Sequence, residues 1–458
     1  MNVLFASAEF APLIRVGGLG EAASGLVREL RNQGISVDVV LPDYFGTSLE
    51  HETVTPLTVP RWVGDAVART GIADLVGQVT LVQVPGIRKP HPYVDTGGEG
   101  WPDNPDRFFA FSAAVAALAE QRRPDVVHLN DWHTAMTLAF MAVDVPSVLT
   151  IHTLGYQGWT SGGWLDRIRN RSDLFEVGGG TNPMAGAIAL ADRVIAVSPN
   201  YADEIRRPET GAGLHELLTS RGSDLVGIRN GIDVSIWNPA ADTEIAEQYS
   251  VDHLAGKTTS RLDLLDEVGW ADADIPVVGV VSRLVEQKGI EFVLEATRFA
   301  RTMPFRLIML GSGERWITTE ASRVTSERPD SFVFRNGYDG NFAHKIFAGS
   351  DLLFMPSRFE PCGLAQMQAM AYGTIPVVTS VGGLKDTVID ADSDETNGTG
   401  FVSETVDGAG VVDALHRAVR AWNDLDRRAA IQLRGMSSDW SWTPPARQHI
   451  DLYQELVD

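Results

Sequence analysis

Two cations stand five residues apart at the end of an apolar run in the second half of the chain. Arg283 and Lys288 follow Val277–Val281, which is short, β-branched and apolar, and they precede a helical pattern. Ligands of open α/β sheets bind at the carboxyl ends of the strands, so this position suits cations that hold an anion. Lys288 is one of only five lysines among 38 basic residues, which favours a specific role over a solvated surface charge.

A carboxylate lies in a comparable position farther along the chain. The segment 356–364, with the sequence PSRFEPCGL, follows the apolar run Leu352–Met355 and leads into a helical pattern. Glu360 in such a turn can accept hydrogen bonds from sugar hydroxyls, and the free N–H groups of the next helix can face a diphosphate. The alternative is a carboxylate that only stabilises the helix dipole.

Two glycine turns also follow predicted strands. Residues 15–20, with the sequence RVGGLG, come after Asn2–Ala6, and residues 381–384, with the sequence VGGL, come after Ile375–Val378. Glycine lets a backbone approach a ligand closely, and a helix N-terminus presents N–H groups to an anion. The first spacing is not that of a dinucleotide fingerprint, so alone it is also compatible with an ordinary tight turn.

Polar and aromatic residues follow two strands of the first half. They lie in residues 130–133, with the sequence NDWH, and 152–158, with the sequence HTLGYQG. His128, His133 and His152 are candidate ligands of a metal ion, but their spacing matches no known pattern of zinc ligands. The pairs Asp272/Asp274 and Asp390/Asp392 lie in polar stretches and read better as solvated acidic turns.

Short apolar runs alternate with helical patterns through both halves of the chain. This alternation predicts parallel sheets with helices on both faces, and therefore two doubly wound domains. The expected first domain is 1–238 and the second is 239–441, with a boundary beside Trp237-Asn238-Pro239. A C-terminal helix over 442–458 is expected to pack back onto the first domain. Residues 46–107 carry no clear pattern. The expected strands are 2–6, 36–41, 126–129, 148–151, 194–197, 277–281, 306–310, 332–334, 352–355 and 375–378, and the expected helices include 20–33, 290–301 and 364–372.

Composition narrows the classes of function. The formal net charge of −22 makes nucleic-acid binding unlikely because an acidic surface repels phosphate backbones. No apolar run is long enough to cross a membrane, and the N-terminus lacks the basic region of a signal peptide. A single cysteine, Cys362, fits a reducing compartment, so we expect a cytoplasmic protein.

Taken together, these motifs resemble the bacterial and plant type of glycogen (starch) synthase, glycosyltransferase family 5. The resemblance runs from Asn2 to about Val388, and the combination is specific although each piece alone is common. It rests on the Gly-Gly-Leu loop near residue 17, Asp131-Trp132-His133, His152, Tyr156-Gln157-Gly158, residues 198–202, residues 230–239, Arg283, Lys288, residues 311–314, residues 357–364 and Gly382-Gly383-Leu384.

The resemblance implies a GT-B fold, with two Rossmann-like doubly wound domains facing each other across a deep cleft. It implies that glucose passes from ADP-glucose to the non-reducing-end 4-hydroxyl of an α-1,4-glucan such as glycogen or a maltooligosaccharide, with retention of configuration. It implies no metal or other cofactor. It says nothing of the oligomeric state.

The resemblance also assigns roles to individual residues. The catalytic set is His152, Arg283, Lys288 and Glu360. The donor and nucleotide set is Arg15, Gly17, Gly18, Asn230, Tyr338, Cys362, Gly363, Leu364, Gly382 and Gly383, with Tyr338 beside the adenine. The acceptor side is Asp131, Trp132, His133 and Tyr156.

Three positions depart from the family's usual residues. Arg15 stands where lysine is usual, Thr153 where asparagine is usual, and Ala365 where threonine or serine is usual. These changes leave open a UDP-glucose donor or a small acceptor such as glucose 1-phosphate. A glucan-binding paralogue without turnover is the alternative of another class.

Overall fold

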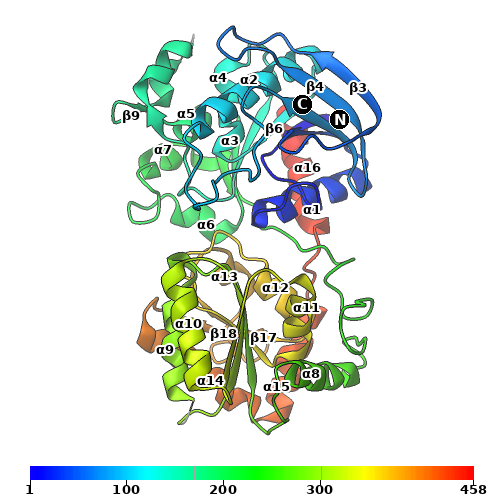
Figure 1. The fold of residues 1–458 in the computed structure, drawn as a ribbon, viewed down its shortest axis with the longest axis vertical. Coiled ribbons are helices and arrows are strands. Elements are labelled where there is room, and N and C mark those ends of the chain that lie inside the picture. Colours follow the sequence, from blue (N-terminus) through cyan, green and yellow to red (C-terminus); the bar gives the residue numbers. More distant parts are fainter. Residues whose placement is uncertain (169–170, 301) are drawn as a thin grey trace. The chain divides into compact units, whose positions relative to one another are not determined.

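The computed structural model describes residues 1–168, 171–300 and 302–458, which divide into two compact units (Figure 1). The first unit comprises Met1–Gly231 and Trp442–Asp458, and the second comprises Ile232–Ser441. The chain enters the second unit at Ile232, earlier than the boundary expected after Asn238. The reason is local packing: the Trp237 ring stacks on His344, with ring centroids 4.1 Å apart.

The first unit is built on a nine-stranded sheet in the order β12-β11-β7-β6-β1-β2-β5-β4-β3. The strands from β12 to β5 are parallel, whereas β3 and β4 add an antiparallel edge. The edge strands come from residues 46–107, which the sequence left unassigned. The strands are β1 (Asn2–Ala6), β2 (Ser36–Pro42), β3 (Glu50–Pro56), β4 (Val67–Ala73), β5 (Gly77–Gln83), β6 (Val126–Asn130), β7 (Ser147–Ile151), β11 (Arg193–Ala196) and β12 (Leu225–Gly227).

Helices connect the parallel strands of this unit, as the alternation predicts. A small antiparallel sheet lies between β7 and α5 in the sequence; its strands are β8 (Thr160–Ser161), β9 (Glu176–Val177) and β10 (Gly180–Thr181). The helices are α1 (Gly18–Asn32), α2 (Asn104–Arg122), α3 (Trp132–Ala135), α4 (Thr137–Phe140), α5 (Pro183–Leu190), α6 (Pro199–Glu204), α7 (His215–Ser220) and α16 (Thr443–Val457).

The C-terminal helix α16 packs against α1 and β6 of the first unit. Its Tyr453 hydroxyl shares a 2.5 Å hydrogen bond with His128 Nδ1 in β6. Gly25 in α1 is required for this packing, since a Cβ there would lie 2.1 Å from the Trp442 indole nitrogen. The last residues of the chain therefore complete the core of its first domain.

The second unit is built on a six-stranded, wholly parallel sheet in the order β15-β14-β13-β16-β17-β18. All five strands expected for this half are present, and Figure 1 shows helices on both faces of the sheet. The strands are β13 (Val277–Val281), β14 (Arg306–Gly311), β15 (Phe332–Asn336), β16 (Leu352–Met355), β17 (Ile375–Thr379) and β18 (Phe401–Ser403).

The helices of this unit are α8 (Ala255–Glu267), α9 (Ile290–Ala296), α10 (Arg315–Glu327), α11 (Gly340–Gly349), α12 (Ala365–Ala371), α13 (Gly382–Thr387), α14 (Gly408–Trp422) and α15 (Leu425–Ser437). The helix expected over 290–301 is shorter than predicted, because α9 gives way to a 3-10 turn over Thr297–Phe299; residue 301 lies outside the described residues. Among the described residues, no helix is long and apolar enough to cross a membrane.

Candidate active site

In the second unit, the structure brings the predicted cation and carboxylate motifs together. The strands β13 and β16 are neighbours in the sheet, so the turns that follow them meet at the carboxyl edge. Lys288 Nζ lies 2.5 Å from Glu360 Oε2, and the Ser357 hydroxyl donates a 3.0 Å hydrogen bond to the same oxygen. Glu360 is 5% exposed. The result is a largely buried ion pair at the edge where ligands bind in such sheets.

Close backbone packing explains why glycines stand in these turns. A Cβ on Gly289 would lie 2.0 Å from the Pro356 carbonyl oxygen, and one on Gly382 would lie 1.9 Å from the Glu360 carbonyl oxygen. The Gly383 N–H also donates a 3.0 Å hydrogen bond to that carbonyl. Gly382 and Gly383 therefore hold the Glu360 turn in place by close approach of one backbone to another.

The other predicted donor residues of this unit differ in their exposure to solvent. Arg283 is exposed, and among the described residues no carboxylate pairs with it. Tyr338 follows β15 and is 75% exposed, which leaves much of its ring accessible to a ligand. The Cys362 thiol is buried, and Gly363 takes a left-handed φ of 75° that favours glycine. Leu364 is partly buried at the start of α12.

In the first unit, a buried carboxylate absent from the predicted set holds the glycine loop. Glu9 Oε2 accepts hydrogen bonds from the N–H groups of Val16 and Gly17, both at 2.8 Å, and Glu9 Oε1 accepts one of 2.8 Å from the Tyr93 hydroxyl. The Gly17 amide, which the resemblance assigns to donor binding, already has a hydrogen-bond partner. The sequence feature that could have identified Glu9 is a carboxylate shortly after the apolar strand Asn2–Ala6.

The two other donor residues of this loop face outward. Arg15 is exposed and forms an ion pair with Glu21. Gly18 is exposed, and an added Cβ would meet no atom within 4 Å. The loop is therefore open to solvent at Gly18.

Strands β6 and β7 end beside one another and carry Asp131 and His152. Asp131 Oδ1 accepts hydrogen bonds from the N–H groups of His152, at 2.8 Å, and Thr153, at 3.4 Å. Its backbone has φ 54° and ψ −176°, a region almost confined to glycine and often found at functional sites. Burial is the main cause that raises the pKa of Asp131 to about 7.

His152 contacts the neighbouring strand through its ring. Its Nε2 lies 2.9 Å from Asn130 Oδ1, and burial lowers the pKa of His152 to about 3. Asn230 lines the same small cavity as His152, together with Trp442 of the C-terminal segment. The structure therefore places the predicted residues Asp131, His152 and Asn230 together.

Trp132 and His133, which the resemblance assigns to the acceptor side, start α3 inside an aromatic cluster. The His133 ring lies 5.0 Å from Tyr93 and 4.7 Å from Phe108, measured between ring centroids. Burial lowers the pKa of His133 to about 3, and its Nδ1 is buried without a hydrogen-bond partner. His133 thus contributes a neutral ring to the wall of this region.

A cavity of about 480 Å³ opens beside that wall. It is lined by Asn104, Pro105, Trp132, Gly155, Tyr156, Gln157, Gly158 and Trp159. Tyr156 and Trp159 are both more than half exposed. Sequence reasoning missed Trp159, although it stands three residues after Tyr156. Exposed aromatic faces beside a cavity suit a ligand with apolar faces and polar edges.

The histidines considered as a metal set do not gather. His128 Nδ1 and Nε2 are hydrogen-bonded to Tyr453 and to Thr150, the latter at 2.7 Å. Within the part of the chain that the structure describes, no group of three or more His, Cys, Asp or Glu side chains could hold a metal ion. That no metal is needed stays a prediction.

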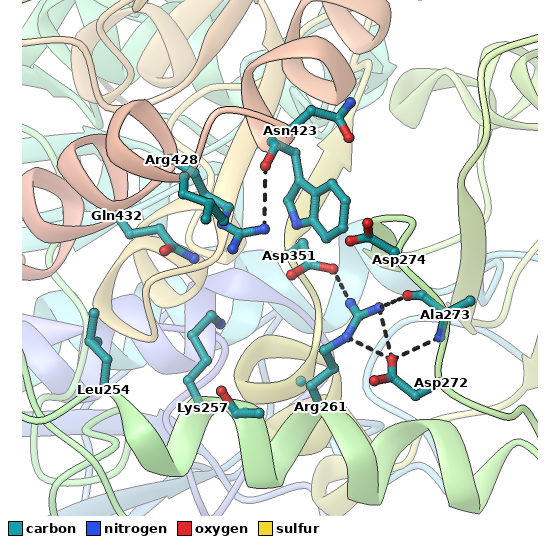
Figure 2. A pocket seen from close by; sticks show the side chains of 14 residues that line it. Leu254, Lys257, Arg261, Asp272, Ala273, Asp274, Asp351, Asn423, Arg428 and Gln432 are labelled. Carbon is teal, nitrogen blue, oxygen red and sulfur yellow. Dashed lines mark hydrogen bonds and ion pairs between the residues drawn. The ribbon is translucent and has the colours of Figure 1, made fainter.

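A cavity of about 730 Å³ in the second unit lies at the opposite ends of the strands and contains none of the predicted site residues (Figure 2). Arg261 in its wall is saturated by an ion pair with Asp351 and by the carbonyls of Ala273 and Ile275. Lys257 donates to the carbonyls of Ala348, Ser350 and Tyr372, and burial lowers its pKa to about 7. These cations tie helices to the sheet.

Comparison with known proteins agrees with this geometry. A family described as "Starch synthase catalytic domain" matches residues 2–220, and one described as "Glycosyl transferases group 1" matches residues 275–421. A glycogen synthase of Halorhodospira halophila is 37% identical over 100% of this chain and 99% of its own length. The chain belongs to the glycogen and starch synthase family.

Other members of the glycogen and starch synthase family show the same full-length likeness. Glycogen synthase 2 of Geobacter sulfurreducens is 38% identical over 100% of this chain and 99% of its own length. The catalytic domain of starch synthase IV from Arabidopsis thaliana, solved with ADP and acarbose, matches with a TM-score of 0.88 and 31% identity, covering 100% of this chain and 99% of that one.

A more distant structure shares the fold. Sucrose-phosphate synthase from Thermosynechococcus elongatus matches with a TM-score of 0.65 and 18% identity, covering 99% of this chain and 98% of that one. The chain is a glycosyltransferase of the GT-B fold with two Rossmann-like domains, as the sequence motifs predicted.

Proposed function

We propose that this glycosyltransferase extends an α-1,4-glucan by transferring glucose from ADP-glucose to the 4-hydroxyl at the non-reducing end, with retention of configuration. The observation that carries the proposal is the buried Lys288–Glu360 pair at the carboxyl edge of the second sheet, beside the exposed Arg283. Full-length likeness to a starch synthase solved with ADP and acarbose supports the donor and the acceptor class.

On the donor side, the two cations match the negative charge of the leaving group. The bond between glucose C1 and the phosphate oxygen breaks with its electron pair on the diphosphate, so negative charge develops there. Arg283 and Lys288 stabilise that charge, and fixed cations at a developing charge are a strong source of catalysis. Glu360 accepts hydrogen bonds from glucose hydroxyls, while Lys288 and Ser357 hold it in place.

The acceptor glucan binds to the first unit in this proposal. The cavity beside Trp132, Tyr156 and Trp159 presents aromatic faces for the apolar faces of glucose rings. His152 lies beside the reacting glucose, and Asp131 holds the His152 backbone. Under the proposal no metal takes part, and the enzyme works in the cytoplasm.

One assay tests the whole proposal. The purified protein is incubated with ADP-glucose and either glycogen or a maltooligosaccharide, while ADP release and chain extension are measured together. We expect one glucose added to the glucan for each ADP released. ADP release without extension of any glucan would contradict the proposal.

The unusual residues Arg15, Thr153 and Ala365 leave other substrates open, and the same assay can test each of them. UDP-glucose in place of ADP-glucose tests the donor, and glucose 1-phosphate in place of glycogen tests a small acceptor. Tight glucan binding without nucleotide release would identify a glucan-binding paralogue. We expect ADP-glucose to give the higher kcat/KM of the two donors.

A further inference from the structure

Asn130 links the predicted catalytic residue His152 to the centre of the first sheet. It is the last residue of β6 and is 1% exposed. Its Nδ2 donates a 2.9 Å hydrogen bond to the Ala6 carbonyl in β1, and its Oδ1 lies 2.9 Å from His152 Nε2. The roles derived from the sequence include no role for Asn130.

The two contacts of Asn130 fix the direction of both hydrogen bonds. A backbone carbonyl can only accept, so the amide nitrogen of Asn130 must face Ala6. The amide oxygen therefore faces His152, and it too can only accept. His152 Nε2 must carry a proton to fill this contact.

The other ring nitrogen of His152 is then an acceptor. Burial keeps the His152 ring neutral near pH 7, so the ring carries a single proton, and that proton is on Nε2. Nδ1 has no hydrogen-bond partner among the described residues, and unlike the Nδ1 atom of His133 it is not cut off from solvent. It is left with a free lone pair.

We propose that Asn130 is a positioning residue that holds His152 in the Nε2–H tautomer, so that Nδ1 accepts a hydrogen bond from a hydroxyl of the transferred glucose. This inference rests on the proposed function, which puts His152 beside the reacting sugar. Asn130 itself touches no substrate, and its effect passes through the imidazole.

The strand register supports a dedicated contact. Asn130 pairs with Thr150 across β6 and β7, so His152, two residues farther on, comes at the end of the same strand pair. Asp131 already anchors the His152 backbone through its N–H group. The contact from Asn130 is therefore not needed to fix the backbone of His152, and it orients only the imidazole ring.

The tautomer is measured directly by ¹⁵N NMR of the full chain labelled at histidine, with the His152 signals assigned from a His152→Gln variant. We expect a protonated Nε2 and an unprotonated Nδ1 in the parent protein. In Asn130→Leu, which has a similar volume and no acceptor, we expect both tautomers and a fall in kcat/KM of roughly 10-fold or more. A parent His152 protonated on Nδ1 would overturn the inference.

Ser147→Ala is the matched control. Ser147 is buried at the opposite end of β7, where its hydroxyl donates a 2.9 Å hydrogen bond to Asp192. This variant loses a buried hydrogen bond of the same strand without touching His152, so its His152 signals and kcat/KM should stay at parent values. Equal losses of kcat/KM in both variants would reduce Asn130 to a structural residue and overturn the inference.

Asn130→Asp provides a second variant whose readout does not depend on the folding of Asn130→Leu. A carboxylate still accepts the Nε2 proton, but it favours the charged imidazolium and raises the His152 pKa. The ring is also faced by His449 of α16, His128 of β6 and Asp131. We expect kcat/KM of Asn130→Asp to fall more steeply than that of the parent protein as the pH drops towards about 5, since the titration of Asp131 is common to both proteins. Matching pH profiles would overturn the inference.

The two proposals can fail separately. If the parent protein does not extend a glucan from ADP-glucose, the proposed function fails, whereas the NMR signals still report which nitrogen of His152 carries the proton. If the glucan is extended but the tautomer is the same in Asn130→Leu, only the role of Asn130 fails.

Discussion

Lys288 and Glu360 bind each other in this structure, so a substitution of either residue changes both the site and the stability of the turn. The sequence could predict both residues because each is a charged side chain at a strand end. It could not predict their contact, which depends on β13 and β16 being neighbours in a sheet of order 14-13-16. Adjacency of strands is a tertiary property.

Lys288→Ala should lower kcat/KM for ADP-glucose by at least ~100-fold, because the leaving diphosphate loses a fixed positive charge. Steady-state kinetics with glycogen measure this. Lys345→Ala is the control, since Lys345 also binds a glutamate, Glu267, at 2.6 Å but lies far from the carboxyl edge in α11. A Lys288→Ala enzyme as fast as Lys345→Ala would contradict the role.

Asp131 should make the stability of the chain depend on pH. Its native pKa is about 7, against an ordinary value of 3.8, so between these values the native state keeps a proton that the unfolded chain releases. The contribution of Asp131 to the free energy of unfolding therefore falls as the pH rises from about 4 to about 7.

Asp131→Asn should remove that fall, because an amide oxygen still accepts from the His152 N–H but does not ionise. Urea unfolding of both proteins at pH 5 and pH 8 measures it. Between pH 5 and pH 8, the free energy of unfolding of the variant should rise relative to that of the parent by on the order of 2–4 kcal/mol. The same stability difference at both pH values would show that Asp131 does not titrate in this range.

At the scale of elements, periodicity and turn residues predicted the strands and most helices, whose ends agree within a few residues. The antiparallel edge of β3 and β4 was not predictable, since the exposed strand β3 carries a charged and polar pattern, EHETVTP. The hold of Glu9 on the glycine loop was also missed. It depends on Tyr93, which lies in the region without a pattern.

Glu9→Leu should free the glycine loop and raise the KM for ADP-glucose by about 10-fold, because the loop loses two hydrogen bonds to a buried carboxylate. Hydrogen exchange at the amides of Val16 and Gly17 should speed up in the same variant. Glu9→Gln is the matched control: its oxygen can accept from both amides while its nitrogen donates to the Tyr93 hydroxyl. We expect it to stay near the parent KM. Slow exchange at both amides in Glu9→Leu would show that Glu9 does not hold the glycine loop.

At the scale of the whole molecule, the first unit is discontinuous and the second is inserted into it. The chain passes between the units twice, after Gly231 and after Ser441. The segments next to these two points are hydrogen-bonded, since the Ile232 N–H donates a 2.8 Å hydrogen bond to the Trp440 carbonyl. The repeated strand–helix alternation was enough to predict two doubly wound domains. The buried polar contacts that join α16 to β6 are long-range and leave no local signal.

Two tyrosine hydroxyls allow each unit to be perturbed separately. Tyr453→Phe leaves His128 Nδ1 buried without a partner, so the first unit should lose about 1–3 kcal/mol of stability. Tyr249→Phe removes a 2.9 Å hydrogen bond to the Tyr372 carbonyl, so it should destabilise the second unit alone. Hydrogen exchange should speed up at β6 amides only in the first variant and at β16 amides only in the second. Faster exchange at both strands in either variant would mean that the units unfold together.

The discontinuous first domain has a consequence for how the protein is made. A ribosome completes all the residues of the second domain, from Ile232 to Ser441, before it adds the helix that the first domain still needs. Until then, the surface of β6 and α1 that later buries Ile450 and Tyr453 has no cover. The nascent protein thus finishes its N-terminal domain last. A messenger RNA that stops at codon 441 would yield a second unit with all its residues, attached to a first unit with an exposed apolar face.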